Sequence, residues 1–279
     1  EDYKLGFVSA VSQAFKHFES KGYTKTNFQF YFNNKHYWKC SFFGMAGSRK
    51  NGSSYWLLDE PVDYDDYAAV RFFLDLGKQG YEKAGAGKIK VQYRTDVSQP
   101  EMTRGLWDGY CDLWNSSGLI DYASTAMFRI RRLPDEEYWR YGGGPKISGK
   151  LIDFQQNFFT LWCIGAIGAL PYWNNLSGTD WFSPNELALV FTGNDYARSG
   201  RQYDGALPSV RLKAMRRAQQ DMEYLNLLSA KSGWDEEKVR AALAGFADDK
   251  DSRVLKCDRL SSGELNKLRR AVAKALISK

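Results

Sequence analysis

Tyr55-Trp56-Leu57-Leu58-Asp59-Glu60-Pro61 is an apolar run that ends abruptly in two adjacent carboxylates and a proline. The segment that follows, residues 64–83, repeats apolar residues at the spacing of one helix face. Together they predict a strand at 54–59 and then a helix, the repeating unit of a parallel α/β sheet. Functional side chains of such sheets gather at the carboxyl ends of the strands, which makes Asp59 and Glu60 the first candidates for chemistry.

The same alternation continues on both sides of this unit. We expect a helix at 2–21 and strands at 27–32, 88–94, 119–124, 138–141, 164–172 and 187–191, with helical stretches near 99–114 and 148–161. After residue 207 the pattern is all helical, with helices expected at 208–230, 235–246 and 261–277.

This order predicts an α/β fold of the (β/α)8 TIM-barrel type over residues 1–200, with a helical extension over 201–279 packed on the barrel. The first element is a helix, and fewer strands are recognisable than the eight that close a barrel. We therefore expect the first barrel strands to be missing from this chain.

The composition narrows the class of protein. Hydrophobic residues make up 43% and charged residues 26% of the 279 positions, as in ordinary globular proteins. The 15% of aromatic residues leaves two interpretations open, an aromatic-rich core or rings that line a cleft.

The distribution of charge and of apolar residues argues against two kinds of partner. The net charge of +6 is spread along the chain, and the basic cluster at 211–217 is interleaved with Asp221 and Glu223. Such a pattern favours a solvated or ion-paired helix face, so we expect no nucleic-acid partner. The longest apolar run, 161–173, is too short for a bilayer and contains glycines and a proline, so no membrane span is expected.

The sequence gives little support for a metal site or for histidine-based catalysis. The four cysteines lie far apart without ligand spacing, and the only histidines, His17 and His36, accompany no nucleophile motif. We expect no metal and no cofactor, and acid–base work therefore falls to carboxylates.

Other polar and aromatic residues follow the ends of the expected strands. Such a set of amides, a cation and stacking rings suits a sugar. The expected substrate-binding residues are Asn33, Asn34, Lys35, Tyr93, Tyr141, Tyr172 and Trp173.

The adjacency of Asp59 and Glu60 restricts their mechanism. Most glycosidases place two carboxylates across the scissile bond, which neighbouring residues do not easily do. Neighbouring carboxylates suit substrate-assisted catalysis, in which the 2-acetamido oxygen of the sugar attacks the anomeric carbon. The alternative is that the Asp-Glu-Pro run caps the next helix, where acidic residues are favourable.

From residue 27 to about 228 the chain resembles glycoside hydrolase family 123 and the related DUF4091 group. The resemblance includes Asn33-Asn34-Lys35, Leu58-Asp59-Glu60-Pro61 and Gly165 with Leu170-Pro171-Tyr172-Trp173. Its strongest part is Leu207-Pro208-Ser209-Val210-Arg211-Leu212-Lys213-Ala214-Met215-Arg216-Arg217, continuing to Leu225. Thr192-Gly193 departs from the Pro-Gly turn of the relatives.

The resemblance implies a retaining β-N-acetylgalactosaminidase that acts through an oxazolinium intermediate on a glycan or glycoconjugate. Asp59 would then polarise the acetamido group, and Glu60 would be the general acid and later the base. The resemblance favours secretion or a periplasmic location. In relatives the pair ends the fourth strand, so a companion chain that supplies two strands is one expectation. A non-catalytic carbohydrate-binding or structural subunit on a hydrolase-like fold is the alternative, and a hydrolase for another sugar is a third possibility.

Overall fold

The computed structural model describes residues 1–32, 55–103, 105–117, 135–142, 144, 146–163, 165–171, 176–177, 188–193, 200, 203–232 and 260–277. The chain divides into two compact units. The first comprises Glu1–Ile120 and Ser124–Trp139, and the second comprises Asp121–Ala123 and Arg140–Lys279. The boundary expected near residue 200 falls within the second unit.

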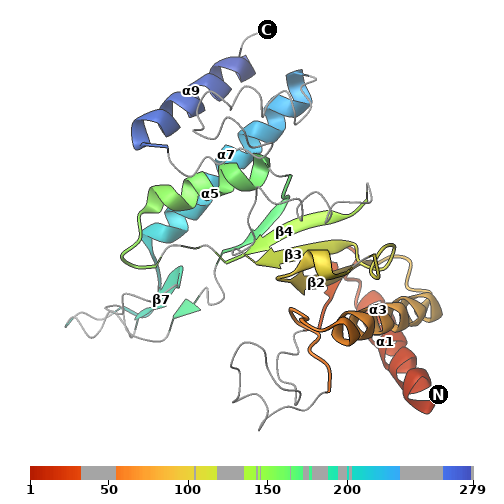
Figure 1. Ribbon diagram of the computed structural model, residues 1–279. Helices are drawn as coiled ribbons and strands as arrows, with labels where there is room; N and C mark the ends of the chain where they lie inside the picture. The colour runs from red at the N-terminus through yellow and green to blue at the C-terminus, as the bar shows by residue number, and fades with distance from the viewer. Residues whose placement is uncertain are drawn as a thin grey trace. The chain divides into compact units, whose positions relative to one another are not determined.

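Two helices of the first unit, α1 (Asp2–Ser20) and α3 (Tyr64–Ala84), pack side by side (Figure 1). Glycines in α3 permit the close approach. A Cβ atom added to Gly80 would lie 2.6 Å from Val11 Cγ1 in α1. A Cβ atom on Gly77 would lie 2.7 Å from the ring of Phe30, so α3 is also in tight contact with the sheet.

The sheet has the strand order β1-β2-β3-β4-β5. Its strands are β1 (Asn27–Phe30), β2 (Lys90–Val97), β3 (Leu113–Ser117), β4 (Glu137–Tyr141) and β5 (Gly168–Leu170). The β1–β2 and β2–β3 pairs are parallel, with Phe30 opposite Tyr93 and Asp96 opposite Asn115. β1 and β5 form the two edges, so the sheet is open.

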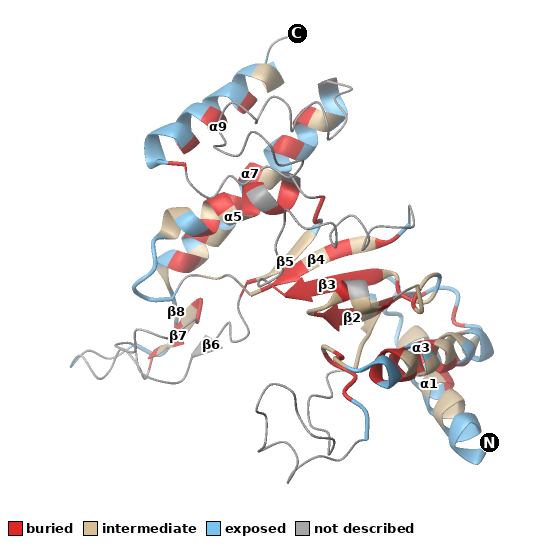
Figure 2. Cartoon of the chain, viewed as in Figure 1, coloured by how far each residue is buried: buried red, intermediate tan, exposed pale blue. Residues whose placement is uncertain are grey.

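The two faces of this sheet differ in chemistry. Partner residues of a parallel ladder point to the same side, and side chains alternate along each strand. One face carries aromatic residues that pack on the helices, as in the stacking of Phe28 on Phe18 of α1 with ring centroids 4.6 Å apart. The opposite face, which we call the polar face, carries Gln29, Tyr31, Gln92, Arg94, Asp96, Asn115, Glu137 and Trp139. β3 is buried along its whole length (Figure 2).

The second unit contains α5 (Leu151–Cys163), α7 (Val210–Ser232) and α9 (Ser262–Ile277). Their core includes Phe159, Trp162, Leu225 and Leu265. Asp221 of α7 accepts hydrogen bonds from Arg269 of α9, with an Oδ2–Nη2 distance of 2.6 Å. Within α7, Arg217 Nη2 lies 3.4 Å from Asp221 Oδ1, which confirms the expected ion pairing along this helix. A small sheet, β6-β7-β8, comprises Leu176–Ser177, Val190–Thr192 and Ala206–Pro208.

The prediction of a (β/α)8 barrel is wrong. In the described residues the main sheet has five strands with β1 and β5 at its edges, and the fold is an open α/β sheet with helices. The expected strand at 54–59 would have separated β1 from β2, but these two strands pair directly. Residues 55–60 form bends rather than a strand, and the N–H of Leu57 donates to the carboxylate of Asp66 instead of to a neighbouring strand.

Several element boundaries also differ from the expected ones. The helix expected near 99–114 is a short 3-10 turn, η1 (Pro100–Thr103), followed by β3. α5 extends to Cys163, which shortens the following strand to Gly168–Leu170. Pro208 ends β8 instead of opening α7. The strand expected at 119–124 and the helix at 235–246 lie outside the described residues.

Within the described parts of the chain, no helix combines the length and the apolar character that crossing a bilayer requires.

We predict opposite effects for two glycine-to-alanine changes. Gly80→Ala should lower the free energy of unfolding by about 1–3 kcal/mol, because the new methyl group overlaps Val11. Gly6→Ala should raise it by about 0.5–1 kcal/mol, since Gly6 is an exposed position of α1 with nothing within 4 Å of the added Cβ. Denaturant unfolding of the two variants checks this, and equal shifts in one direction would contradict the packing.

Candidate functional site

Two backbone hydrogen bonds position the acidic pair. The Leu57 N–H donates to Asp66 Oδ1 at 3.1 Å, and the Glu60 N–H donates to the carbonyl oxygen of Asp96 at 3.2 Å. Asp66 belongs to the capping box that starts α3 at Asp63. Asp59 and Glu60 are therefore fixed between the beginning of α3 and the carboxyl end of β2.

Glu60 has a backbone φ of 56°, and it is the one non-glycine residue with positive φ in the described part of the chain. This left-handed conformation costs an L-residue with a Cβ atom about 1–2 kcal/mol. Such backbone strain concentrates at functional sites, where the surrounding structure holds it in place. The strain therefore singles out Glu60 on an observation independent of its chemistry.

Asp59 is buried, and Tyr31 at the end of β1 forms a side-chain hydrogen bond with it. Burial raises the pKa of the Tyr31 phenol well above its ordinary value, and the charges of Asp96 and Asp59 raise it further. The phenol therefore stays protonated at neutral pH and donates a hydrogen bond to the Asp59 carboxylate, which fixes the orientation of that carboxylate.

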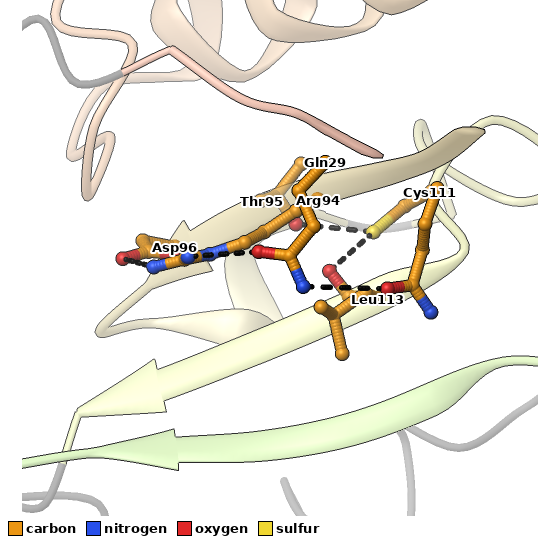
Figure 3. A network of polar contacts seen from close by, with 7 residues as sticks. Gln29, Arg94, Thr95, Asp96, Cys111 and Leu113 are labelled. Carbon is orange, nitrogen blue, oxygen red and sulfur yellow. Dashed lines mark hydrogen bonds and ion pairs between the residues drawn. The ribbon is translucent and has the colours of Figure 1, made fainter. Parts of the chain in front are cut away.

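Arg94 organises the polar face next to this pair. Its Nε and Nη2 donate to Asp96 Oδ1 and Oδ2 at 2.7 and 2.8 Å, and its Nη1 donates to Gln29 at 3.1 Å (Figure 3). The guanidinium carbon also lies 4.4 Å from the centre of the Tyr31 ring. Both oxygens of Asp96 are thus engaged, and this carboxylate serves to hold Arg94 in place.

A chain of amide contacts continues toward the amino ends of the strands. Gln29 Nε2 donates to Gln92 Oε1 at 3.4 Å, and Gln92 Nε2 donates to Glu137 Oε2 at 2.6 Å. These bonds link β1, β2 and β4 on one face and satisfy the amides of both glutamines.

Asn115 and Trp139 differ from these partnered groups. Asn115 is 0% exposed, and neither its Oδ1 nor its Nδ2 has a hydrogen-bond partner among the described residues. The indole N–H of Trp139 likewise has none there. The sequence reasoning missed Asn115 because it placed the end of a helix where β3 lies, although the alternation in Leu113-Trp114-Asn115 was available as a signal. Trp139 lies in the strand expected at 138–141, but the sequence did not single it out.

The buried thiol of Cys111 is a poor candidate for a nucleophile. Its Sγ lies 3.1 Å from Thr95 Oγ1, and Thr95 alternates with Arg94 and Asp96 to the opposite side of β2 (Figure 3). Burial raises the pKa of the Cys111 thiol far above its ordinary value, so the thiolate is not populated near neutral pH.

The other expected site residues are distributed differently. Tyr93 points to the helix-covered face, with its ring 5.4 Å from that of Phe30, so the structure does not bring it to the acidic pair. Tyr141 is buried at the end of β4, in the second unit. Asn33, Asn34, Lys35, Tyr172 and Trp173 lie outside the described residues.

One acidic cluster in the described chain has the spacing of metal ligands, namely Asp63, Asp65 and Asp66. Asp66 already accepts the N–H groups of Leu57 and Asp63 at the start of α3. The cluster is therefore explained by helix capping.

Comparison of the chain with protein-family models, with curated proteins and with solved structures found no match in any of the three.

The backbone of Glu60 gives a prediction that does not depend on activity. Glu60→Gly and Glu60→Ala both remove the carboxylate, but only glycine adopts a φ of 56° without a Cβ clash. The glycine variant should have a free energy of unfolding about 1 kcal/mol higher than the alanine variant. Denaturant unfolding measures the difference, and a more stable alanine variant would show that the left-handed conformation is absent.

Proposed function

We propose that this protein is a glycoside hydrolase that removes terminal β-linked N-acetylhexosamine, with N-acetylgalactosamine favoured, by substrate-assisted retaining catalysis. One observation carries the proposal. A buried, phenol-bonded carboxylate, Asp59, is followed at once by a second carboxylate on a strained backbone, at the carboxyl end of a parallel strand. The resemblance to glycoside hydrolase family 123 supports the same assignment.

Asp59 has the surroundings of a group that orients and stabilises rather than one that exchanges protons. The Tyr31 phenol and the burial of Asp59 hold its carboxylate in one position. A fixed carboxylate can accept the N–H of the substrate acetamido group, and this hydrogen bond strengthens as the nitrogen gains positive charge.

Glu60 is half-buried and thus more accessible than Asp59. In the first step the acetamido oxygen bonds to the anomeric carbon, the glycosidic bond breaks, and the Glu60 carboxyl gives its proton to the leaving oxygen. In the second step the Glu60 carboxylate takes a proton from water, which opens the oxazolinium ring and restores the acetamido group. The sugar therefore leaves with its anomeric configuration retained.

The open sheet favours a second candidate, a non-catalytic carbohydrate-binding subunit. The strand ends of a closed barrel surround a ligand, whereas five strands with two free edges provide fewer walls. An assay of glycoside hydrolysis distinguishes the two candidates, because a binding subunit binds the sugar without hydrolysing a glycoside.

We predict a substrate-dependent effect for Glu60→Gln. A nitrophenyl N-acetylgalactosaminide has a good leaving group and needs little protonation, so its hydrolysis should fall only slightly. Hydrolysis of an alkyl N-acetylgalactosaminide should fall by about 100- to 10,000-fold, the usual contribution of a general acid. kcat/KM for both substrates gives the comparison, and equal losses would remove Glu60 from the acid role.

Asp59→Asn should behave differently and slow both substrates by similar factors, because formation of the oxazolinium ring is impaired whatever group leaves. Glu82→Gln, which changes an exposed acid of α3, is the matched control and should leave both rates unchanged. Full activity of Asp59→Asn, or no hydrolysis of either substrate by the unmodified chain, contradicts the proposed mechanism.

A further inference from the structure

We propose that Asn115 and Trp139 contact the ligand of the polar face directly and read the hydroxyl groups of a sugar ring. This inference rests on the proposed function for the nature of the ligand, and it names the residues that give the site its specificity. It is carried by hydrogen-bonding groups that the described protein leaves unsatisfied.

The register of the sheet places Asn115 next to the residues already described. Asn115 on β3 is the partner of Asp96 on β2, so the two side chains point to the same face. The backbone carbonyl of Asp96 accepts the N–H of Glu60, which links this position to the acidic pair. Trp139 lies two residues after Glu137, whose bond to Gln92 shows that this side of β4 also belongs to the polar face.

The unpartnered amide of Asn115 destabilises the folded protein. Sealing an amide from water without a hydrogen bond costs about 1–3 kcal/mol by protein mutational data. Gln29 and Gln92 show that the same face can satisfy amides, since each of them is bonded to neighbouring side chains. A buried amide of this kind calls for a partner from outside the protein, and a bound molecule is one such partner.

The free groups define the ligand chemistry. An asparagine amide offers one acceptor and two donor hydrogens, and an indole offers one donor. Neighbouring hydroxyl groups on a sugar ring match this set, because each hydroxyl both donates and accepts. The Trp139 ring adds an apolar plane on which the C–H groups of a sugar can stack. The neighbouring Asp96 holds Arg94 through both of its oxygens.

The test uses the full chain and N-acetylgalactosamine as the probe, with the Kd measured by calorimetry. Asn115→Leu should weaken binding by about 10- to 100-fold, the loss expected for one to two hydrogen bonds. The same variant should keep or raise the thermal unfolding midpoint, because an apolar side chain of similar volume replaces an unsatisfied one. A merely structural asparagine would show the opposite result, with a lower midpoint and unchanged binding.

Gln92→Leu is the matched control. It removes an amide on the same face that is already bonded to Gln29 and Glu137, so it should lower the unfolding midpoint and weaken binding far less than Asn115→Leu does. A direct readout comes from the Trp139 indole N–H resonance, assigned by its loss in Trp139→Phe. This resonance should shift when N-acetylgalactosamine is added to the unmodified chain and should not shift in Asn115→Leu at the same sugar concentration.

The outcomes separate this inference from the proposed function. Binding that depends on Asn115 without hydrolysis supports the inference and removes the enzyme assignment. Hydrolysis by the unmodified chain with an unchanged Kd in Asn115→Leu overturns the inference and leaves the enzyme standing. Absence of any binding by the unmodified chain overturns the inference. If Asn115→Leu fails to fold, Asn115→Ala replaces it with the same expected loss of binding.

Discussion

The carboxylate of Asp66 is the interaction on which the candidate site depends. One of its oxygens accepts the N–H of Leu57, and the other accepts the N–H of Asp63 at the start of α3. A single buried side chain thus caps a helix and fixes the irregular segment that carries Asp59 and Glu60. The segment needs no place in the sheet, because Asp66 and the carbonyl of Asp96 supply the partners that a strand would have supplied.

The two faces of the sheet have different roles: the aromatic face stabilises the fold, and the polar face carries the groups available for recognition. The aromatic face packs on α1 and α3 through close contacts. The polar groups of the other face differ in kind along the length of the strands. Amides bonded to each other lie toward the amino ends of the strands, and the Arg94–Asp96 ion pair lies further along β2. The unsatisfied groups of Asn115 and Trp139 belong to the same face. Rigid, satisfied contacts therefore support the region in which free hydrogen-bonding capacity remains.

Sequence reasoning was most successful where periodicity was long and strong. The helices α1, α3 and α9 were predicted within a few residues, because each buries one continuous apolar stripe. The segment 55–60 has the composition of a strand end, yet its backbone N–H groups form hydrogen bonds with Asp66 and Asp96. Asp66 lies outside the apolar run, and Asp96 is distant in sequence. No local pattern indicates such partners. The prediction of a barrel was wrong for a related reason. Closure of a barrel depends on which strands pair and not on how many apolar runs the chain contains. Tyr31 and Asn115 escaped attention because their importance comes from register across strands.

Gly77 and Gly80 stand three residues apart, where α3 meets Phe30 of β1 and Val11 of α1. In mechanical terms, α3 is clamped near its middle between a strand and a helix, and the acidic pair lies just before its first turn. Sliding α3 along its axis would bring larger side chains into collision with both neighbours. The packing therefore opposes movement of the helix in this direction. The position of Glu60 then depends on the first turns of α3, on the Asp66 contacts and on the bond from its own N–H to the carbonyl of Asp96. The placement of the acids thus depends in part on two glycines in the middle of the helix that follows them.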